Sequence, residues 1–409
     1  MIGGSRDDDH RAGEPGRLDA GADAPRLGIL ASHPIQYQAP LYRELARLLD
    51  LTVFFAHRQS REAQADAGFG VAFDWDVDLH SGYRHEFLHN VARNPGVDRF
   101  SGCDTPDIAR RIREKRFDAF LVMGWQLKCF WQAVWACRRA GVPVMVRGDS
   151  QLATPRSRAK QAVKELLYPR LVRQFDAGLY VGARNKAYLE HYGARPHRLF
   201  FSPHCVDGNA FAESAGRSDR DAVRAQWGLT GGDRAVLFAG KFLPRKRPMD
   251  LVLAIARLRA DGAPVVAILA GDGPLRGELE TTAKGLGAPL RCLGFRNQTE
   301  LPAVYAAADA LVLPSEGSET WGLVVNEALA CGTPCVVSDA CGCAPDMIVQ
   351  NVTGSTFPMG NVASLTKTIA RVLEIPRASP GLRAHVERYS PRAAANGVRD
   401  AAHALRKRR

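Results

Sequence analysis

Residues 314–334 read PSEGSETWGLVVNEALACGTP, and this stretch decides the fold. An apolar run precedes it at 310–313, Gly322 stands just before a helical pattern that begins at Leu323, and a second apolar run follows at 335–337. A strand, a loop, a helix and a further strand in this order are typical of one unit of a parallel sheet.

Short apolar runs alternate with longer helical stretches on both sides of this segment. The runs fall into two blocks, separated by a Pro- and Gly-bearing stretch at 202–209. We therefore predict an α/β protein with two doubly wound, Rossmann-like domains that face a shared cleft, where phosphorylated ligands bind. The expected strands are 27–31, 51–55, 119–123, 142–146 and 178–181 in the first block, and 235–239, 265–270, 290–293, 310–313 and 335–337 in the second.

The two blocks set the expected domain boundaries. Residues 1–25 are rich in Asp, Gly and Arg and lack an apolar core, so we expect a disordered tail and no signal peptide. The two domains are expected at 26–205 and 206–380. Residues 381–409 are expected to form a helical segment, with Ser390 as an N-cap, that could pack back on the first domain.

Composition excludes several classes of protein. The chain has 409 residues, beyond the roughly 250–300 at which a single core stops growing. Its 46% hydrophobic and 24% charged residues exclude disordered and collagenous chains. The formal net charge of +12 favours anionic partners such as phosphorylated substrates, nucleic acid or acidic lipid. No RNA- or DNA-binding module is recognisable, so we expect no nucleic-acid partner.

Cysteine spacing and hydropathy indicate the compartment. Nine scattered cysteines form an odd set, and C-x₃-C-x₅-C-x-C from Cys331 to Cys343 fits no zinc pairing, so we expect reduced thiols and no metal. The apolar stretch 119–137 is interrupted by Gln126 and Lys128, which predicts a strand running into a helix rather than a membrane span. We expect a cytoplasmic protein.

The helix that opens at Leu323 carries the first chemical prediction. The N–H groups of Leu323 and Val324 would form an anion site suited to a diphosphate. Glu327 lies one turn into the helix, and its carboxylate leans back toward the same end, where it could accept hydrogen bonds from ribose hydroxyls. Glu319, in the preceding loop, would face the other end of such a ligand.

Further motifs accompany this one in a fixed order. They are FAGKFLPRK at 238–246, GDGP at 271–274, LGFR at 293–296, the two glutamates spaced E-x₇-E at 319 and 327, and CGTP at 331–334. In this order and spacing, residues 206–357 resemble the nucleotide-binding domain of retaining glycosyltransferases of the GT-B fold, family 4 type, also called glycosyl transferases group 1.

The resemblance implies a role for each matching residue. Glu327 would bind the donor ribose, Glu319 would contact the transferred sugar, and Lys241 and Lys246 would neutralise the departing diphosphate. Lys241 departs from the family pattern, which usually has arginine there. The remaining donor-binding residues implied are Gly240, Phe295, Arg296, Gly322, Leu323 and Val324. The implied mechanism needs no metal and no cofactor, with a nucleoside-diphosphate sugar as donor.

The first half supplies the expected acceptor side. His33 and Gln36 follow the first strand, where the family often has a glycine-rich loop. After the strand at 142–146 the family commonly has a histidine, and counting from Pro143 places Asp149 there. Asp149 could contact sugar hydroxyls or cap the following helix.

Two other stretches allow alternative hypotheses. Asp74 and Asp76 form an Asp-x-Asp pair, which binds the donor's metal in the GT-A fold, although no long apolar strand precedes it. Residues 156–175 carry six basic residues and one acidic residue beside an apolar stripe, as in helices that lie on anionic lipid. An ordinary packed amphipathic helix is the other interpretation.

We therefore predict a metal-independent glycosyltransferase that moves a hexose-type sugar to an acceptor with retention of configuration. The expected acceptor is a lipid-linked or surface-polysaccharide saccharide, reached peripherally at the inner face of a membrane. A nucleotide-sugar epimerase of the same fold and a non-catalytic subunit that binds nucleotide sugar remain alternatives.

Overall fold

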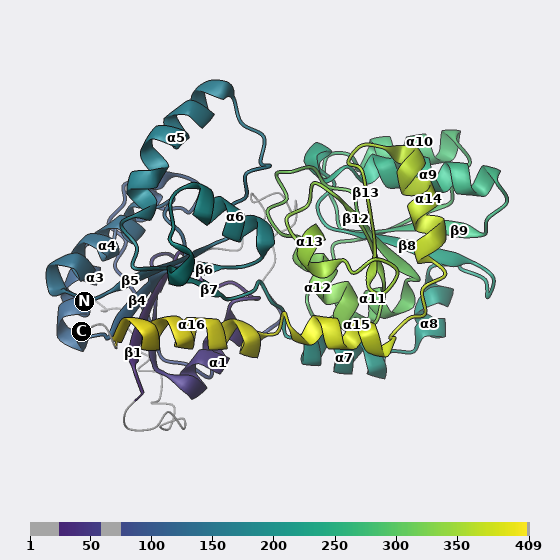
Figure 1. Cartoon of the computed structure of the whole chain (residues 1–409). Helices are drawn as coiled ribbons and strands as arrows, with labels where there is room; N and C mark the ends of the chain where they lie inside the picture. The colour runs from purple at the N-terminus through teal and green to yellow at the C-terminus, as the bar shows by residue number, and fades with distance from the viewer. Residues whose placement is uncertain (1–23, 59–74, 407–409) are drawn as a thin grey trace, which may run out of the picture.

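The computed structural model describes residues 24–58 and 75–406, which form two parallel sheets (Figure 1). The first sheet has the order β3-β2-β1-β4-β5-β6-β7, and the second has the order β10-β9-β8-β11-β12-β13. Every pairing between neighbouring strands is parallel. The prediction of two doubly wound α/β domains is confirmed.

The first domain contains seven strands with helices on both faces. Its strands are β1 (Arg26–Ala31), β2 (Asp50–Phe55), β3 (His85–Phe87), β4 (Ala119–Val122), β5 (Val144–Gly148), β6 (Ala177–Tyr180) and β7 (Leu199–Phe201). Its helices are α1 (Ala39–Leu48), α3 (Ile108–Lys115), α4 (Lys128–Ala140), α5 (Arg158–Val172) and α6 (Ala183–His191).

The second domain repeats this architecture. Its strands are β8 (Arg234–Ala239), β9 (Val265–Ala270), β10 (Leu290–Gly294), β11 (Ala310–Leu313), β12 (Cys335–Ser338) and β13 (Gly354–Phe357). Its helices are α7 (Gly208–Arg217), α8 (Arg220–Gln226), α9 (Pro248–Ala260), α10 (Arg276–Gly285), α11 (Leu301–Ala307), α12 (Leu323–Ala330), α13 (Ala344–Met347), α14 (Val362–Val372) and α15 (Pro380–Glu387).

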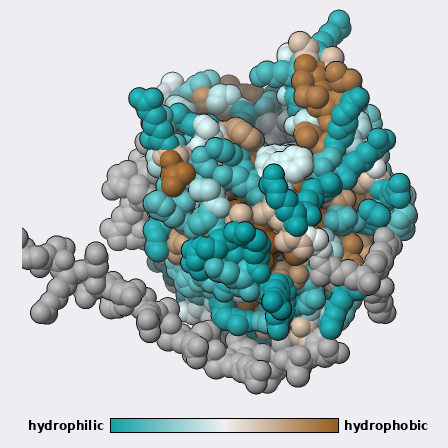
Figure 2. Space-filling view, turned by 90° about the vertical axis from the view of Figure 1, so that its left-hand side faces the viewer, coloured by the Kyte–Doolittle hydropathy of each residue, from teal (hydrophilic) through white to brown (hydrophobic). Residues whose placement is uncertain are grey.

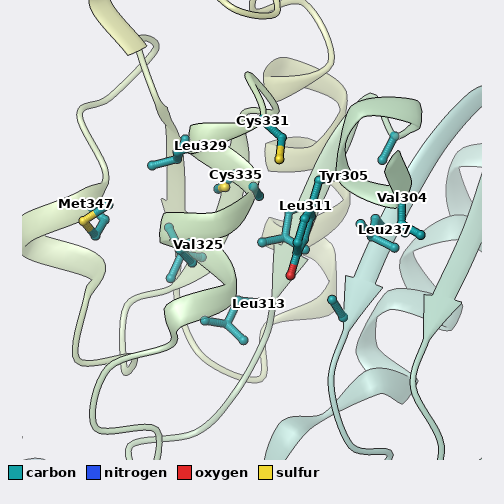
Figure 3. Close-up of a cluster of buried hydrophobic side chains, with 14 of the residues drawn as sticks. Leu237, Val304, Tyr305, Leu311, Leu313, Val325, Leu329, Cys331, Cys335 and Met347 are labelled. Carbon is teal, nitrogen blue, oxygen red and sulfur yellow. The ribbon is translucent and has the colours of Figure 1, made fainter. Parts of the chain in front are cut away.

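Hydrophobic side chains fill both faces of each sheet. In the second domain one core lies between β11, α11 and α12, and Figure 3 shows the Tyr305 ring beside Leu311 there. Successive residues of a strand point to opposite faces, so the fully buried run 310–313 feeds the cores on both sides of the sheet. Within the described residues, none of the helices combines the length and the apolar character that crossing a bilayer requires.

Three strands were not predicted from the sequence pattern. β3, β7 and β13 have only three or four residues each, and β3 reads His-Glu-Phe, with no apolar run. Each lies at an edge of its sheet, where pairing on one side suffices. Hydropathy alone does not detect such strands because one flank is covered by solvent or loops rather than by the core.

The last helix, α16 (Pro391–Arg406), lies along α1 of the first domain (Figure 1). Ser390 caps it, since its hydroxyl accepts a hydrogen bond from the Ala393 N–H at 3.2 Å. The buried Gly397 allows the helix to approach β7 closely, because a Cβ there would lie 1.7 Å from the Phe201 carbonyl oxygen. The chain thus returns from the second domain to complete the core of the first.

Replacing Gly397 by alanine tests this contact. Alanine normally stabilises a helix interior by about 1 kcal/mol relative to glycine. At position 397 the added methyl must displace α16 from β7, so we expect the free energy of unfolding to fall by about 2 kcal/mol or more. Denaturant unfolding measures the change. Gly277→Ala in α10 is the matched control, because its Cβ meets open space, and it should be neutral or stabilising. Equal gains at both positions would contradict the close approach.

Candidate active site

The candidate site lies where the strands of the second domain end and its loops meet the first domain. Gly240 and Lys241 follow β8, and the loop 314–322 follows β11. The loop after β9 packs closely against Gly240. A Cβ on Gly271 would lie 2.0 Å from the Gly240 carbonyl oxygen, and Gly271 has a φ of +138°. Only glycine fits this approach, so the GDGP motif fixes the backbone beside Lys241.

Lys246 and Glu319 come together in this loop cluster. Lys246 ends the short turn Pro244–Lys246, and its Nζ forms an ion pair with the Glu319 carboxylate. Both side chains are mostly buried, with exposed fractions of 20% and 14%. Burial lowers the pKa of the nearby Lys241, with Arg245 and Lys246 as further causes. Lys241, Arg245 and Lys246 therefore concentrate positive charge here, and the Glu319 carboxylate pairs with Lys246.

Helix α12 begins directly after its N-cap Gly322, whose φ of +108° belongs to the left-handed region that glycine tolerates. A Cβ at Gly322 would lie 2.5 Å from Leu313, so the strand and the helix can approach closely only with glycine there. The first-turn N–H groups of Leu323 and Val324 have no acceptor within the helix and carry its positive dipole end. This end of α12 is suited to an anion.

Glu327 is buried within the same helix. The Tyr305 hydroxyl donates a hydrogen bond of 2.6 Å to its Oε2, and the Gln298 side chain forms another. Burial raises the pKa of Glu327 to about 7, although both hydrogen bonds oppose the shift. Sequence reasoning missed Tyr305 and Gln298, because Tyr305 reads as an ordinary core residue and Gln298 as part of a turn.

The turn with the expected donor-binding residues Phe295 and Arg296 is stabilised by its own hydrogen bonds. Arg296 donates to Glu300 at 2.8 Å and to the Leu293 carbonyl at 3.0 Å, and Phe295 beside it is half-buried. These contacts fix the turn at the end of β10, next to the Gln298 that reaches Glu327.

Asp149 reaches this site from the first domain. Its carboxylate accepts a 2.6 Å hydrogen bond from the Thr320 hydroxyl and lies 3.7 Å from Nε2 of the buried His204. These contacts hold the pKa of Asp149 at about 2, despite the opposing effect of burial. Capping of the following helix is excluded, since Ser157 caps α5. His204, in the interdomain connection, places an imidazole beside the position where the family pattern has one.

Gln151 fastens the two domains together. Its fully buried side chain donates hydrogen bonds of 2.9 Å and 3.0 Å to the carbonyl oxygens of Gly317 and Glu319. Arg184 of α6 adds bonds to Gln151 and to the Ala340 carbonyl. The first domain thus positions the backbone of the loop that carries Glu319.

The other first-domain candidates lie before α1. His33 is half-buried, its Nδ1 is 3.0 Å from the Ser32 hydroxyl, and burial lowers its pKa to about 4, so it is neutral at pH 7. Gln36 is half-buried in the turn that precedes α1. Tyr37, which sequence reasoning did not select, packs edge-on against His204 with ring centroids 6.0 Å apart.

The Asp-x-Asp pair is only partly within the described residues. Asp74 lies outside them. Asp76 accepts hydrogen bonds from the backbone N–H and the hydroxyl of Thr299 in the second domain. Asp76 therefore joins the two domains.

The second domain resembles proteins of known family. Residues 219–393 match the model for glycosyl transferases group 1. D-inositol 3-phosphate glycosyltransferase from Segniliparus rotundus is 32% identical over 222 residues, covering 51% of this chain and 47% of that protein. The Geodermatophilus obscurus protein of the same name is 35% identical over 214 residues, covering 49% and 46%. The chain thus matches about half the length of these relatives.

Solved structures share the architecture across both domains. A sucrose-phosphate synthase from Thermosynechococcus elongatus superposes with a TM-score of 0.70 at 19% identity, covering 94% of this chain and all of that one. HepE from Anabaena, in complex with UDP, superposes with a TM-score of 0.69 at 18% identity, covering 93% of this chain and 100% of that one. The chain therefore has the two-domain GT-B fold.

The buried Glu327 carboxyl makes stability depend on pH. Its folded pKa of about 7 lies above the ordinary 4.5. Between these values the folded state holds a proton that the unfolded chain has lost, so the free energy of unfolding falls as pH rises. Glu327→Gln keeps an acceptor for Tyr305 and removes this dependence. We expect the variant to be more stable than the parent by roughly 2–3 kcal/mol at pH 8 and by much less at pH 5.

Thermal unfolding at the two pH values measures this difference. Glu278→Gln is the control, because Glu278 is exposed on α10, and its effect should not grow between pH 5 and pH 8. A Glu327→Gln variant that is equally destabilised at both values would show that the carboxylate is ionised and well paired in the fold.

Proposed function

We propose that the protein is a group 1 glycosyltransferase that transfers a sugar from a nucleoside diphosphate to an acceptor hydroxyl. One observation carries the proposal: two lysines, the N-terminus of α12 and two glutamates converge at the carboxyl ends of β8 and β11, facing the first domain. The segment that matches the family model contains all of these groups.

The charges at this site suit a departing diphosphate. Breaking the bond between a sugar and a nucleoside diphosphate leaves negative charge on the β-phosphate. Lys241, Lys246 and the first turn of α12 belong to neighbouring loops at the ends of β8 and β11, where they would stabilise that charge more in the transition state than in the ground state. Because these groups supply the positive charge, we propose that transfer needs no metal and no cofactor.

The donor is proposed to lie along α12. Glu327 would accept hydrogen bonds from the ribose hydroxyls, and Phe295 and Arg296 would lie at the base. Glu319 would contact the transferred sugar once the diphosphate draws Lys246 away from it. HepE was crystallised with UDP and with UDP and glucose, so a UDP-sugar is the first donor to test. Retention of configuration and membership of the family 4 type belong to this proposal.

The acceptor side is proposed to include Asp149, His33 and Gln36. Asp149 is ionised and touches the loop that carries Glu319, so it can accept a hydrogen bond from a sugar hydroxyl near the reacting carbon. We propose a lipid-linked or surface-polysaccharide saccharide as acceptor.

Helix α5 supports a membrane-borne acceptor. Its Val163, Leu166 and Leu167 are 57%, 63% and 46% exposed, and Figure 2 shows an apolar patch at the top of the molecule, where α5 lies. Arg158 and Lys160 are exposed on the same helix. The apolar stripe predicted from the sequence is thus not packed against the protein. A basic helix with such a stripe suits the surface of an anionic membrane.

Donor turnover tests the proposed activity. With a UDP-sugar and EDTA present, we expect slow donor hydrolysis without acceptor. Lys246→Ala should lower turnover by about 10²-fold or more, since it removes a fixed charge at the leaving group. Lys284→Ala, an exposed lysine on α10, should leave turnover unchanged. Loss of activity in EDTA with recovery in Mn²⁺ would contradict metal independence. Sugar interconversion would indicate an epimerase, and UDP-sugar stabilisation without turnover a binding subunit.

Liposome co-sedimentation tests the membrane surface. Binding to vesicles that contain phosphatidylglycerol should weaken with salt, because each basic residue contributes only about 1 kcal/mol near such a surface. Changing Leu166 and Leu167 to Gln, or Arg158 and Lys160 to Gln, should abolish binding while UDP binding persists. Lys284→Gln in the second domain is the charge control. Salt-independent binding that survives both double substitutions would remove the proposed surface.

A further inference from the structure

A cavity of about 930 Å³ lies beneath α5 in the first domain. It is bounded by α5, α6 and the carboxyl ends of β4 and β5, and this volume falls within the usual range for ligand sites. Its walls are mainly aromatic and apolar, and include Met123, Trp125, Trp131, Tyr168, Leu171 and Tyr188.

One charged side chain in this cavity is buried. Lys164 is only 8% exposed, and its Nζ lies 4.6 Å from the ring centroids of both Tyr168 and Tyr188 and 5.3 Å from that of Tyr192. Among the residues that the structure describes, no carboxylate forms an ion pair with this ammonium group. Ring faces attract a cation but accept no strong hydrogen bond, so its three N–H donors are poorly served.

The charges around the cavity favour an anion with more than one negative oxygen. Arg156 and Lys160 line it together with Lys164, against the single carboxylate of Asp149. Burial lowers the pKa of Lys164 to about 8, and the charge of Arg156 adds to this effect while Glu165 opposes it. The ammonium group is still charged at pH 7, and a bound anion would raise its pKa again, because a nearby opposite charge favours the charged form.

The cavity joins two surfaces already described. Asp149, which bonds to Thr320 in the loop that carries Glu319, is one of its lining residues. Val163, another lining residue, also belongs to the exposed apolar stripe with Leu166 and Leu167. A ligand in the cavity can therefore contact both the proposed transfer site and the apolar surface of α5.

We propose that this cavity binds the junction of an amphiphilic acceptor, with a phosphate ester at Lys164 and the start of its apolar chain along the aromatic walls toward Val163. The sugar attached to that phosphate would then extend toward Asp149. This assignment rests on the proposed function, because it names the class of acceptor for the same site.

Direct binding tests the assignment without turnover. The probes are farnesol, inorganic phosphate and farnesyl phosphate, the last kept below the concentration at which it aggregates. Their binding is measured by the fluorescence of Trp125 and Trp131 and by calorimetry. We expect farnesyl phosphate to bind at least about tenfold more tightly than farnesol, as a charge-assisted hydrogen bond requires. Inorganic phosphate should bind far more weakly than farnesyl phosphate, because it lacks the apolar chain. Equal affinity for farnesol and its phosphate, or for inorganic and farnesyl phosphate, would overturn the proposal.

Five variants locate the site. Lys164→Gln should abolish the preference for the phosphate, Lys164→Arg should keep it, and Lys186→Gln on α6 should leave it unchanged. Ala159→Trp fills the cavity from an exposed helical position and should weaken farnesyl phosphate binding about tenfold or more. Ala162→Trp, exposed on the same helix and outside the lining, is its control. Undiminished binding in Ala159→Trp would overturn the location, whether or not Lys164→Gln folds.

A final comparison separates a free ester from a membrane-borne one. The Leu166, Leu167 to Gln double variant should bind farnesyl phosphate in solution as the parent does, and lose binding only when the ester is presented in vesicles. Binding in vesicles alone would overturn the cavity assignment. Thermal stabilisation by UDP, measured in parallel, tests the proposed function separately. Binding of farnesyl phosphate without binding of UDP would support the cavity assignment and contradict the proposed donor site.

Discussion

The hydrogen bonds from Gln151 to the carbonyl oxygens of Gly317 and Glu319 are the contact on which the site depends. The loop that carries Glu319 is held from both sides. Within the second domain the Glu316 N–H donates to the Arg245 carbonyl and the Gly342 N–H donates to the Glu319 carbonyl, and Gln151 adds its bonds from the first domain. A Cβ at Gly317 would lie 2.5 Å from the Ala153 carbonyl oxygen, so the two backbones are too close here for any residue but glycine at position 317. The same junction brings Asp149 to Thr320. The proposed donor and acceptor sides therefore meet at this junction.

Glu327 shows the cost of preparing such a site. A carboxyl group placed in the core beside Tyr305 is stabilised by a hydrogen bond, yet burial still raises its pKa to about 7. A leucine in its place would pack without that penalty. The apolar packing of Val325, Ala328 and Leu329 of the same helix offsets this cost. Stability lost at one buried group is the expected signature of a residue retained for binding.

The sequence predicted the architecture because strand and helix periods are local properties. Residues 235–239 and 310–313 form strands within a residue or so of the expected bounds, since fully buried parallel strands read as continuous apolar runs. The partners of the site residues were not predictable in the same way. Tyr305, Gln298, Thr320 and His204 carry no local pattern, and what brings them to Glu327 and Asp149 is tertiary packing. The edge strand β3 was missed because its residues are not apolar.

Lys164 illustrates a signal that neither periodicity nor motif could give. In sequence it belongs to a basic stretch and looks like one of several solvated lysines. In the fold it is the one lysine of α5 that turns inward, to three tyrosines contributed by α5, α6 and the residue after α6. Burying the Lys164 ammonium group costs solvation free energy, whereas a lysine on a surface helix can usually extend its ammonium group into solvent. A buried cation next to an exposed apolar stripe makes sense if the ligand itself joins charge to hydrocarbon. Under the proposed function the two features of α5 have a single explanation, an acceptor that arrives from the membrane with its charged group entering the cavity first.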